Sequence, residues 1–306
     1  MRGRFHMRVL VAGGLGFLGK EVSRYLANKG YDVIVVDPAA EGSYQENFMT
    51  IKGTINNPNI LRDIGKVDFI VHSAWDFTED LGKSISENLI GSSNLCEWAA
   101  SLGVKKFVFY SSSVIYGIPI RIPITEDHPL LVEKSRAPLH ALIKLYVEKL
   151  LFYYYYQKSL PITIFRIWWS YSDYRAPGRT YRDILSKVKR GEKIEVPMNA
   201  GGSIVYTGDL AEATETAFYK DEAVGEIFNI SSFYLKWVDV LKKIAMKFGS
   251  SSEISEVEGE WKGPGFLEGS WLLDDSKLRN KLGLSFNSIE RENRFIEVSQ
   301  RMLNLL

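Results

Sequence analysis

A glycine-rich segment near the start of the chain has the spacing of a phosphate-binding loop. Gly13, Gly16 and Gly19 lie in GGLGFLG, between the apolar run MRVLVA at residues 7–12 and a segment with helical periodicity. Glycines at this spacing allow a tight turn, let backbone amides approach a pyrophosphate, and let the helix pack closely on the strand. The partial positive charge at the start of the helix also favours an anion. The sequence therefore predicts that this loop binds the pyrophosphate of a dinucleotide.

An acidic residue ends the next apolar segment, DVIVVD at residues 32–37. A carboxylate at the position of Asp37 accepts hydrogen bonds from ribose hydroxyls and repels a 2′-phosphate, which favours NAD over NADP. Residues 38–46 contain no Arg or Lys, in agreement with NAD. The structural alternative is a turn-forming glycine cluster beside a solvent-exposed aspartate. The coincidence of strand, loop, helix and acid favours NAD.

Strand-like apolar segments alternate with helical segments over the first 165 residues. Right-handed crossovers place helices on both faces of a parallel sheet, so this alternation predicts an α/β fold with a Rossmann-type doubly wound parallel sheet. The predicted strands cover residues 7–12, 32–36, 48–51, 67–71, 106–110 and 162–165.

The pattern becomes less regular after Arg166 and predicts a smaller C-terminal α/β lobe that binds the substrate. A helical segment at residues 209–219 and a strand-like segment at 226–230 indicate that the chain returns to the sheet. We therefore expect an NAD-binding domain at residues 1–165, with a return at about 204–230, and a lobe made mainly of residues 166–306. Residues 1–6 precede the first strand as an extension with no predicted structural role.

Composition and charge restrict the partners that this chain can have. Its 306 residues include 38 Lys and Arg against 37 Asp and Glu, so no global field attracts nucleic acid or an anionic membrane. No apolar run approaches the roughly 18 residues of a membrane span, and no apolar signal segment follows the first charges. The single cysteine, Cys96, permits no internal disulfide. We expect a cytoplasmic protein with a small-molecule substrate and with no nucleic-acid or membrane partner.

Further motifs occur in order along the chain: HSAW at residues 72–75, ENLIGSSNL at 87–95, SSSVIYG at 111–117, and Lys144. Together with the glycine loop they resemble the extended short-chain dehydrogenase/reductases, in particular the NAD-dependent sugar-nucleotide epimerase/dehydratase family. The resemblance covers nearly the whole chain. It implies an enzyme that holds NAD, acts on a sugar nucleotide or a related sugar, and forms a homodimer through helices near residues 86–102 and 139–156. It implies NAD contacts from Gly13, Gly16, Phe17, Leu18, Gly19, Asp37, His72, Ser73, Ala74, Asn88 and Lys144.

The same resemblance implies that Ser112, His140 and Lys144 are the catalytic residues. Ser112 lies four residues before the tyrosine of S-x-x-x-Y-G and matches the hydroxyl group that orients the substrate. The family's general base is the tyrosine of Y-x-x-x-K, but His140 stands four residues before Lys144, on the same helical face. In one interpretation an imidazole with a pKa of about 6.5, kept neutral by the nearby ammonium, accepts the proton. In the other, the ancestral chemistry is lost and His140 only fills the space.

Substrate recognition departs from the family pattern. The family's diphosphate-binding arginine stands four residues before the tyrosine of Y-x-x-D, a position that Gly202 occupies here. Arg175, Arg179 and Arg182 either supply phosphate contacts in its place, because a guanidinium offers a bidentate fork, or form a solvated basic face. Trp168 and Trp169 either wall the pocket or pack in the core. The residues predicted to face the substrate are Trp75, Ser113, Trp168, Trp169 and Arg179.

The residues that follow Ser112 favour one reaction over another. The family's dehydratases place an Asp-Glu pair there, because elimination of water needs an additional acid and base, but this chain has Ser113 and Val114. Epimerisation needs only removal and return of a hydride, so an epimerase is the expected activity. A non-catalytic NAD-binding or scaffold protein, and an NAD-dependent dehydrogenase or reductase of another hydroxylated substrate, are the alternatives. The histidine spacings match no metal-binding motif, so no metal site is expected.

Overall fold

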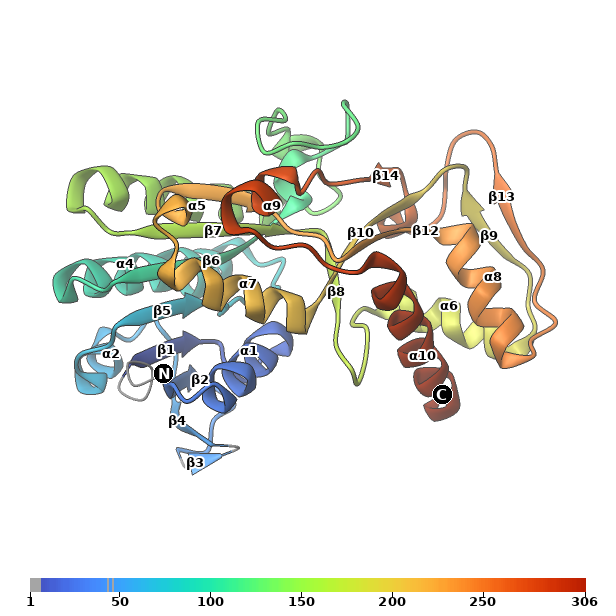
Figure 1. Ribbon diagram of the computed structural model, residues 1–306. Coiled ribbons are helices and arrows are strands. Elements are labelled where there is room, and N and C mark those ends of the chain that lie inside the picture. Colours follow the sequence, from blue (N-terminus) through green and yellow to red (C-terminus); the bar gives the residue numbers. More distant parts are fainter. Residues whose placement is uncertain (1–6, 43, 46) are drawn as a thin grey trace.

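A large sheet domain is joined to a smaller lobe in the computed structural model, which describes residues 7–42, 44, 45 and 47–306 (Figure 1). The predicted extension, residues 1–6, lies outside the described residues. The large domain contains an eight-stranded sheet in the order β11-β7-β6-β5-β1-β2-β4-β3, in which every neighbouring pair is parallel except β3 and β4. Its strands are β1 (Arg8–Ala12), β2 (Asp32–Asp37), β3 (Tyr44–Gln45), β4 (Phe48–Lys52), β5 (Phe69–His72), β6 (Lys106–Ser112), β7 (Ile162–Ile167) and β11 (Glu226–Asn229).

Helices cover both faces of this sheet, and its central strands are apolar and buried nearly throughout for that reason (Figure 1). One face packs on α1 (Phe17–Asn28), α7 (Thr207–Tyr219) and α9 (Ser276–Leu282). The other face packs on α2 (Pro58–Ile64), α4 (Gly91–Leu102) and α5 (Pro138–Lys158). Shorter helical turns, α3 (Leu81–Ser84) and a π-helical segment (Ile85–Ile90), lead into α4.

The strand order reverses direction between β1 and β5. The chain passes from β1 outward to β2 and β4 on one side, and later from β5 outward to β6, β7 and β11 on the other. In open parallel sheets such a reversal leaves a crevice at the carboxyl ends of the strands, where ligands bind. The loops that follow β1, β5 and β6 therefore meet at the expected ligand edge.

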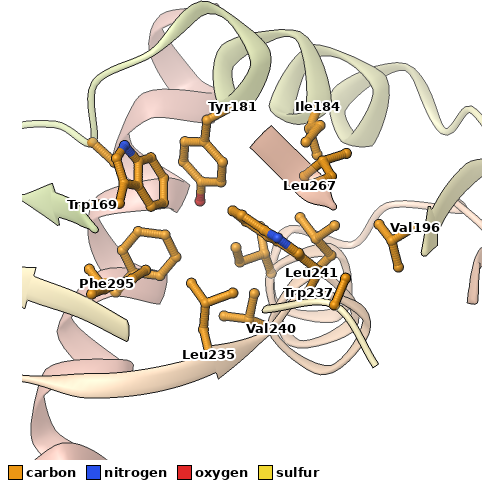
Figure 2. Packing of buried hydrophobic residues seen from close by; sticks show 14 of the residues in the cluster. Trp169, Tyr181, Ile184, Val196, Leu235, Trp237, Val240, Leu241, Leu267 and Phe295 are labelled. Atoms are coloured by element: carbon orange, nitrogen blue, oxygen red, sulfur yellow. The ribbon is translucent and has the colours of Figure 1, made fainter. Parts of the chain in front are cut away.

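The lobe has a core of its own, rich in aromatic side chains (Figure 2). In it, β10 pairs with β12, β14 and β8, and β9 pairs with β13. Trp237, at the start of α8, is fully buried among Trp169, Tyr181 and Phe295. The lobe elements are β8 (Trp169–Tyr171), α6 (Arg179–Arg190), β9 (Ile194–Pro197), β10 (Gly201–Tyr206), β12 (Phe233–Lys236), α8 (Trp237–Phe248), β13 (Ile254–Val257), β14 (Ser270–Trp271) and α10 (Ser288–Leu305).

The prediction of a Rossmann-type doubly wound sheet with a smaller lobe is confirmed, and each predicted strand overlaps an observed one. The chain returns to the large domain through α7 and β11. It also returns a second time, through α9, because Leu278 and Leu282 are buried against that domain's core. Among the described helices, none is long and apolar enough to cross a membrane.

Candidate active site

The glycine loop lies directly after β1 and against the end of β5. Gly13 has φ of +76°, a conformation that L side chains rarely adopt. A Cβ atom there would lie 2.4 Å from Ala74 Cα, and one at Gly19 would lie 2.2 Å from the Gly13 carbonyl oxygen. No larger residue fits at either position without movement of the backbone. Ala74 and Gly19 therefore bring β5 and the start of α1 close to the loop, as a pyrophosphate cradle requires.

Asp37 ends β2 beside this loop, and its carboxylate is buried. One carboxylate oxygen accepts a hydrogen bond from the Leu15 backbone N–H at 3.1 Å, and the other accepts from the Ala39 N–H at 2.9 Å. These bonds hold the carboxylate at the edge of the glycine loop. A carboxylate oxygen can accept a further hydrogen bond, so the position suits a ribose hydroxyl. The glycine loop and Asp37 therefore fit an NAD molecule.

His72 and Asn88 fix the loop that follows β5. The Ser92 hydroxyl donates to the Asn88 carbonyl oxygen, so it accepts a hydrogen bond from His72 Nε2 at 2.8 Å. Complete burial lowers the pKa of His72 to about 3, and the charge of Lys144 adds to this effect. The Asn88 side chain exchanges two hydrogen bonds with the backbone of Asp76, at 2.8 and 2.9 Å. Both side chains therefore hold the backbone of the predicted cofactor edge in place.

Lys144, His140 and Trp75 form one connected group at the ligand edge. Lys144 Nζ donates to the Tyr110 carbonyl oxygen at 2.7 Å, on β6, and lies 3.6 Å from the centroid of the Trp75 ring. The Trp75 indole N–H donates to His140 Nδ1 at 3.0 Å. His140 and Lys144 come from α5, whereas Trp75 comes from the loop after β5. The structure thus brings both predicted catalytic residues of α5 against one indole ring, Lys144 at its face and His140 at its N–H edge.

The surroundings of His140 and Lys144 favour uncharged forms. Burial lowers the pKa of His140 to about 3, and the nearby positive charges of Lys144 and Arg136 lower it further. Burial also lowers the pKa of Lys144 well below its usual value, while the Glu148 carboxylate acts in the opposite direction. Glu148 is itself held by a buried ion pair with Arg166 at 2.7 Å. His140 is consequently neutral at physiological pH.

Ser112 is the least buried member of the serine triplet at the end of β6. Ser111 is buried and its hydroxyl donates to Glu148 at 2.5 Å. Ser113 is buried and its hydroxyl has no hydrogen-bond partner among the described residues. Ser112 is only partly buried, and its oxygen accepts one hydrogen bond, from the Val114 N–H at 3.3 Å. Of the three serines, Ser112 thus has the hydroxyl that remains most accessible, and its contact with the substrate stays a prediction.

The lobe has no room for a side chain at position 202. A Cβ atom on Gly202 would lie 2.4 to 2.5 Å from three carbon atoms of the Trp168 ring. Trp168 also stacks on Phe266, with ring centroids 5.4 Å apart and planes 7° apart. Trp168 is therefore a packing residue of the lobe, and it excludes an arginine from position 202.

Arg136 is a cation between α5 and the lobe that was not among the residues predicted from the sequence. It precedes α5, and its Cζ lies 5.2 Å from the centroid of Phe266 and 5.8 Å from that of Trp271, both in the lobe. Arg136 as a residue is exposed, but its guanidinium lies against these two rings, and burial lowers its pKa to about 10. Within the described part of the chain it forms no ion pair. Arg136 thus spans the gap between the start of α5 and the lobe. The sequence contained one clue to this position: Arg136 stands four residues before His140, a spacing that brings two side chains close together on a helix.

The other residues predicted to face the substrate lie in different surroundings. Trp169 packs in the lobe core against Tyr181 and Phe295, as Figure 2 shows, and its N–H donates to the Pro177 carbonyl oxygen at 3.0 Å. Arg179 is fully exposed at the start of α6, with Asp183 at 3.8 Å. The structure thus assigns Trp169 to packing and leaves Arg179 in solvent.

Of the three arginines proposed for phosphate contacts, Arg175 contacts the start of the helix that follows the glycine loop. Its Cζ is 5.3 Å from the ring centroid of Phe17, the first residue of α1. Arg182 is exposed on α6. Within the described residues, no group of three or more His, Cys, Asp or Glu side chains could hold a metal ion.

A doubly wound sheet with a glycine loop after β1 and an acid at the end of β2 defines a dinucleotide-binding protein. The chain belongs to the NAD-dependent epimerase/dehydratase family, whose sequence pattern matches residues 9–231. This match confirms the predicted family. Membership of the family also confirms the predictions of an enzyme and of NAD as its cofactor.

Relatives of known activity are similar to parts or most of this chain. UDP-glucose 4-epimerase of Bacillus subtilis is 33% identical over 144 residues, which cover 40% of this chain and 42% of that enzyme. The match therefore spans about two fifths of the relative's length. dTDP-D-glucose 4,6-dehydratase of Mus musculus is 25% identical over 280 residues, which cover 84% of this chain and 77% of that enzyme.

Solved structures share the fold over almost the whole chain. UDP-glucose 4-epimerase of Thermotoga maritima, solved with UDP-glucose, superposes with a TM-score of 0.78 at 24% identity, covering 98% of this chain and 100% of that one. A short-chain dehydrogenase/reductase superfamily protein of Agrobacterium tumefaciens, solved with NAD, has a TM-score of 0.81 at 21% identity, covering 97% of each chain. At these identities the likeness establishes the fold.

Proposed function

We propose that this protein is an NAD-dependent epimerase that acts on a sugar nucleotide by reversible hydride transfer. The observation that carries the proposal is the connected group of Lys144, His140 and Trp75 at the ends of β5 and β6, next to the glycine loop. The relatives that are UDP-glucose 4-epimerases support it. The absence of an Asp-Glu pair at Ser113 and Val114 argues against dehydration.

The residues of this chain orient the substrate and handle its proton. NAD, when bound, supplies a hydride acceptor that returns the hydride in the second half of the reaction. Ser112 and His140 hold the hydroxyl oxygen at the carbon that reacts. Lys144, whose pKa burial lowers well below its usual value, accepts the hydroxyl proton as the carbonyl forms and gives it back when the hydride returns. The rings of Trp75 and Phe77 both contact the His140 imidazole, with centroids 5.4 and 5.2 Å away, and so limit how it can turn.

Arg136 is the residue that we expect to meet the diphosphate of the substrate. Position 202 cannot do so, because Trp168 occupies the space for its side chain. Arg136 carries its charge between α5 and the lobe, against the rings of Phe266 and Trp271, and has no carboxylate partner among the described residues. A guanidinium in that setting is suited to a bidentate contact with a phosphate group.

We also propose a cytoplasmic homodimer. Leu142, Tyr146 and Tyr153 form an exposed stripe along α5, and Ile90 is exposed just before α4. Apolar side chains gathered along two neighbouring helices favour contact with another protein surface. Isologous dimers are the commonest assemblies of soluble chains, so a second copy is the expected occupant.

The function is tested by supplying UDP-sugars and dTDP-sugars to protein loaded with NAD. We expect formation of an epimer, followed by NMR, with no net change in absorbance at 340 nm, because the cofactor is regenerated in the site. A stoichiometric absorbance change would instead indicate a dehydrogenase or reductase. Tight NAD binding with no product from any sugar nucleotide would contradict the proposal and leave a scaffold role.

A further inference from the structure

We propose that Trp75 is a positioning residue that fixes His140 in the tautomer with hydrogen on Nε2. In that state His140 acts toward the substrate as a hydrogen-bond donor rather than as a base. The role of His140 as a donor toward the substrate rests on the proposed function. The assignment of the tautomer is independent of that function and can be tested without any substrate.

The direction of one hydrogen bond determines the tautomer. An indole N–H can only donate, so the atom it meets must offer a lone pair. The Trp75 N–H lies 3.0 Å from His140 Nδ1, and the two rings are nearly perpendicular, at 74°. Nδ1 therefore carries no hydrogen. A neutral imidazole has one N–H, which must then be on Nε2.

The imidazole is neutral and its orientation is fixed. Partial burial and the charges of Lys144 and Arg136 both oppose a second proton on the ring. Phe77 stacks on the imidazole, with centroids 5.2 Å apart and planes 11° apart, while Trp75 meets it edge to face. Nε2 has no hydrogen-bond partner within the described residues. The nitrogen left open to a ligand is thus the one that bears hydrogen.

The tautomer with hydrogen on Nε2 suits the half of the reaction in which the hydride returns to the carbonyl group. A neutral imidazole N–H can hold the oxygen of a carbonyl group and stabilise the charge that develops on it when hydride returns. It cannot take a proton at Nε2 while Nδ1 accepts from Trp75. The substitution of His140 for a tyrosine therefore changes the group from a proton-transferring phenol to a fixed hydrogen-bond donor.

Two other histidines provide internal references for the measurement. His72 donates through Nε2 to Ser92, so it has the same tautomer as His140. His128 Nε2 accepts from the Ile120 N–H at 3.1 Å and its Nδ1 lies 2.8 Å from the Pro129 carbonyl oxygen, so its hydrogen is on Nδ1. One spectrum should thus contain both tautomers.

The test is a long-range proton–nitrogen NMR correlation on the full chain with ¹⁵N-labelled histidine at pH 7. His140→Gln assigns its signals, and His6→Gln removes the remaining histidine. We expect His140 and His72 to carry hydrogen on Nε2, and His128 on Nδ1. Trp75→Phe, which keeps a ring but loses the N–H, should shift only His140 toward a mixture of tautomers, whereas Trp98→Phe should not.

Each outcome decides the proposal. A wild-type His140 with hydrogen on Nδ1, or doubly protonated at pH 7, overturns it, even if Trp75→Phe does not fold. An unchanged tautomer in folded Trp75→Phe overturns the role of Trp75. Rescue of the Nε2–H form by Trp75→Gln, whose amide again offers a donor, supports it. Because no substrate is present, failure here is distinct from failure of the proposed epimerase activity.

Discussion

The ring of Trp168 occupies the space that a side chain at Gly202 would need, with ring carbons 2.4 to 2.5 Å from an ideal Cβ position. Both residues are buried, and the ring of Trp168 also packs against the rings of Phe266 and Trp237. The lobe therefore packs in a way that is incompatible with a phosphate-binding side chain at this site.

Gly202→Ala should lower the free energy of unfolding by about 1–3 kcal/mol, because one added methyl group overpacks this contact. Urea denaturation of the purified protein measures the loss. Combining it with Trp168→Leu should restore part of the stability that each change removes alone, since the smaller side chain vacates the space. Strictly additive losses in the double variant would contradict the assigned contact.

Arg136→Gln should weaken binding of UDP about 10- to 100-fold, the loss expected for charge-assisted hydrogen bonds to a phosphate. Isothermal titration calorimetry measures the affinity for UDP and for NAD in the same preparation. Arg179→Gln is the matched control, because Arg179 is exposed on α6 and should leave both affinities unchanged. Equal UDP affinity in Arg136→Gln and the wild type would refute this assignment.

Asp37→Asn should weaken NAD binding about 10-fold and reduce the preference for NAD over NADP. The change removes the negative charge that accepts ribose hydroxyls and repels a 2′-phosphate. Fluorescence or calorimetric titration with both dinucleotides measures the two constants. Asp63→Asn, on α2, should leave them unaltered. If Asp37→Asn keeps the full preference for NAD over NADP, a group other than Asp37 distinguishes the ribose hydroxyl from the 2′-phosphate.

Stability should fall as the pH falls from 7 to 5, in part because of His72. Its pKa is lowered to about 3 in the folded protein, whereas an unfolded histidine titrates near 6.5. Between these values only the unfolded chain binds the extra proton on this histidine. The free energy of unfolding is therefore about 2 kcal/mol lower at pH 5 than at pH 7 because of this residue. Thermal or urea unfolding at both pH values measures the difference.

His72→Gln should reduce that pH dependence. Ser92→Ala, which removes the hydrogen-bond partner but keeps the buried imidazole, should retain it, because burial is the main cause of the shift. If His72→Gln and the wild type lose equal stability between pH 7 and 5, the buried neutral histidine is not responsible.

The sheet and the glycine loop could be predicted because their signals are local. Gly13, Gly19 and Asp37 lie within 25 residues of one another. The alternation of strands and helices places the two glycines between a strand and a helix, and the aspartate at the end of the next strand. The same local reasoning placed His140 and Lys144 on one face of α5. These features follow from spacing along a single element or between consecutive elements.

Other features of the site depend on contacts between distant segments. Trp75 meets His140 across 65 residues, and Arg136 meets Phe266 across 130 positions of the chain. No periodicity links such pairs, so the sequence indicated Trp75 only as a residue facing the substrate. The exclusion of a side chain at Gly202 depends likewise on the packing of Trp168, which tertiary structure alone shows.

The central claim is that a sugar nucleotide bound beside Lys144 and His140 exchanges a hydride with NAD, and that Lys144 is needed for the accompanying proton transfer. It is tested most directly by comparing wild type and Lys144→Met, both saturated with NAD, for epimer formation by NMR. We predict product from the wild type and a rate about 10²- to 10⁴-fold lower in Lys144→Met with NAD still bound. Equal rates in the two proteins would contradict the account.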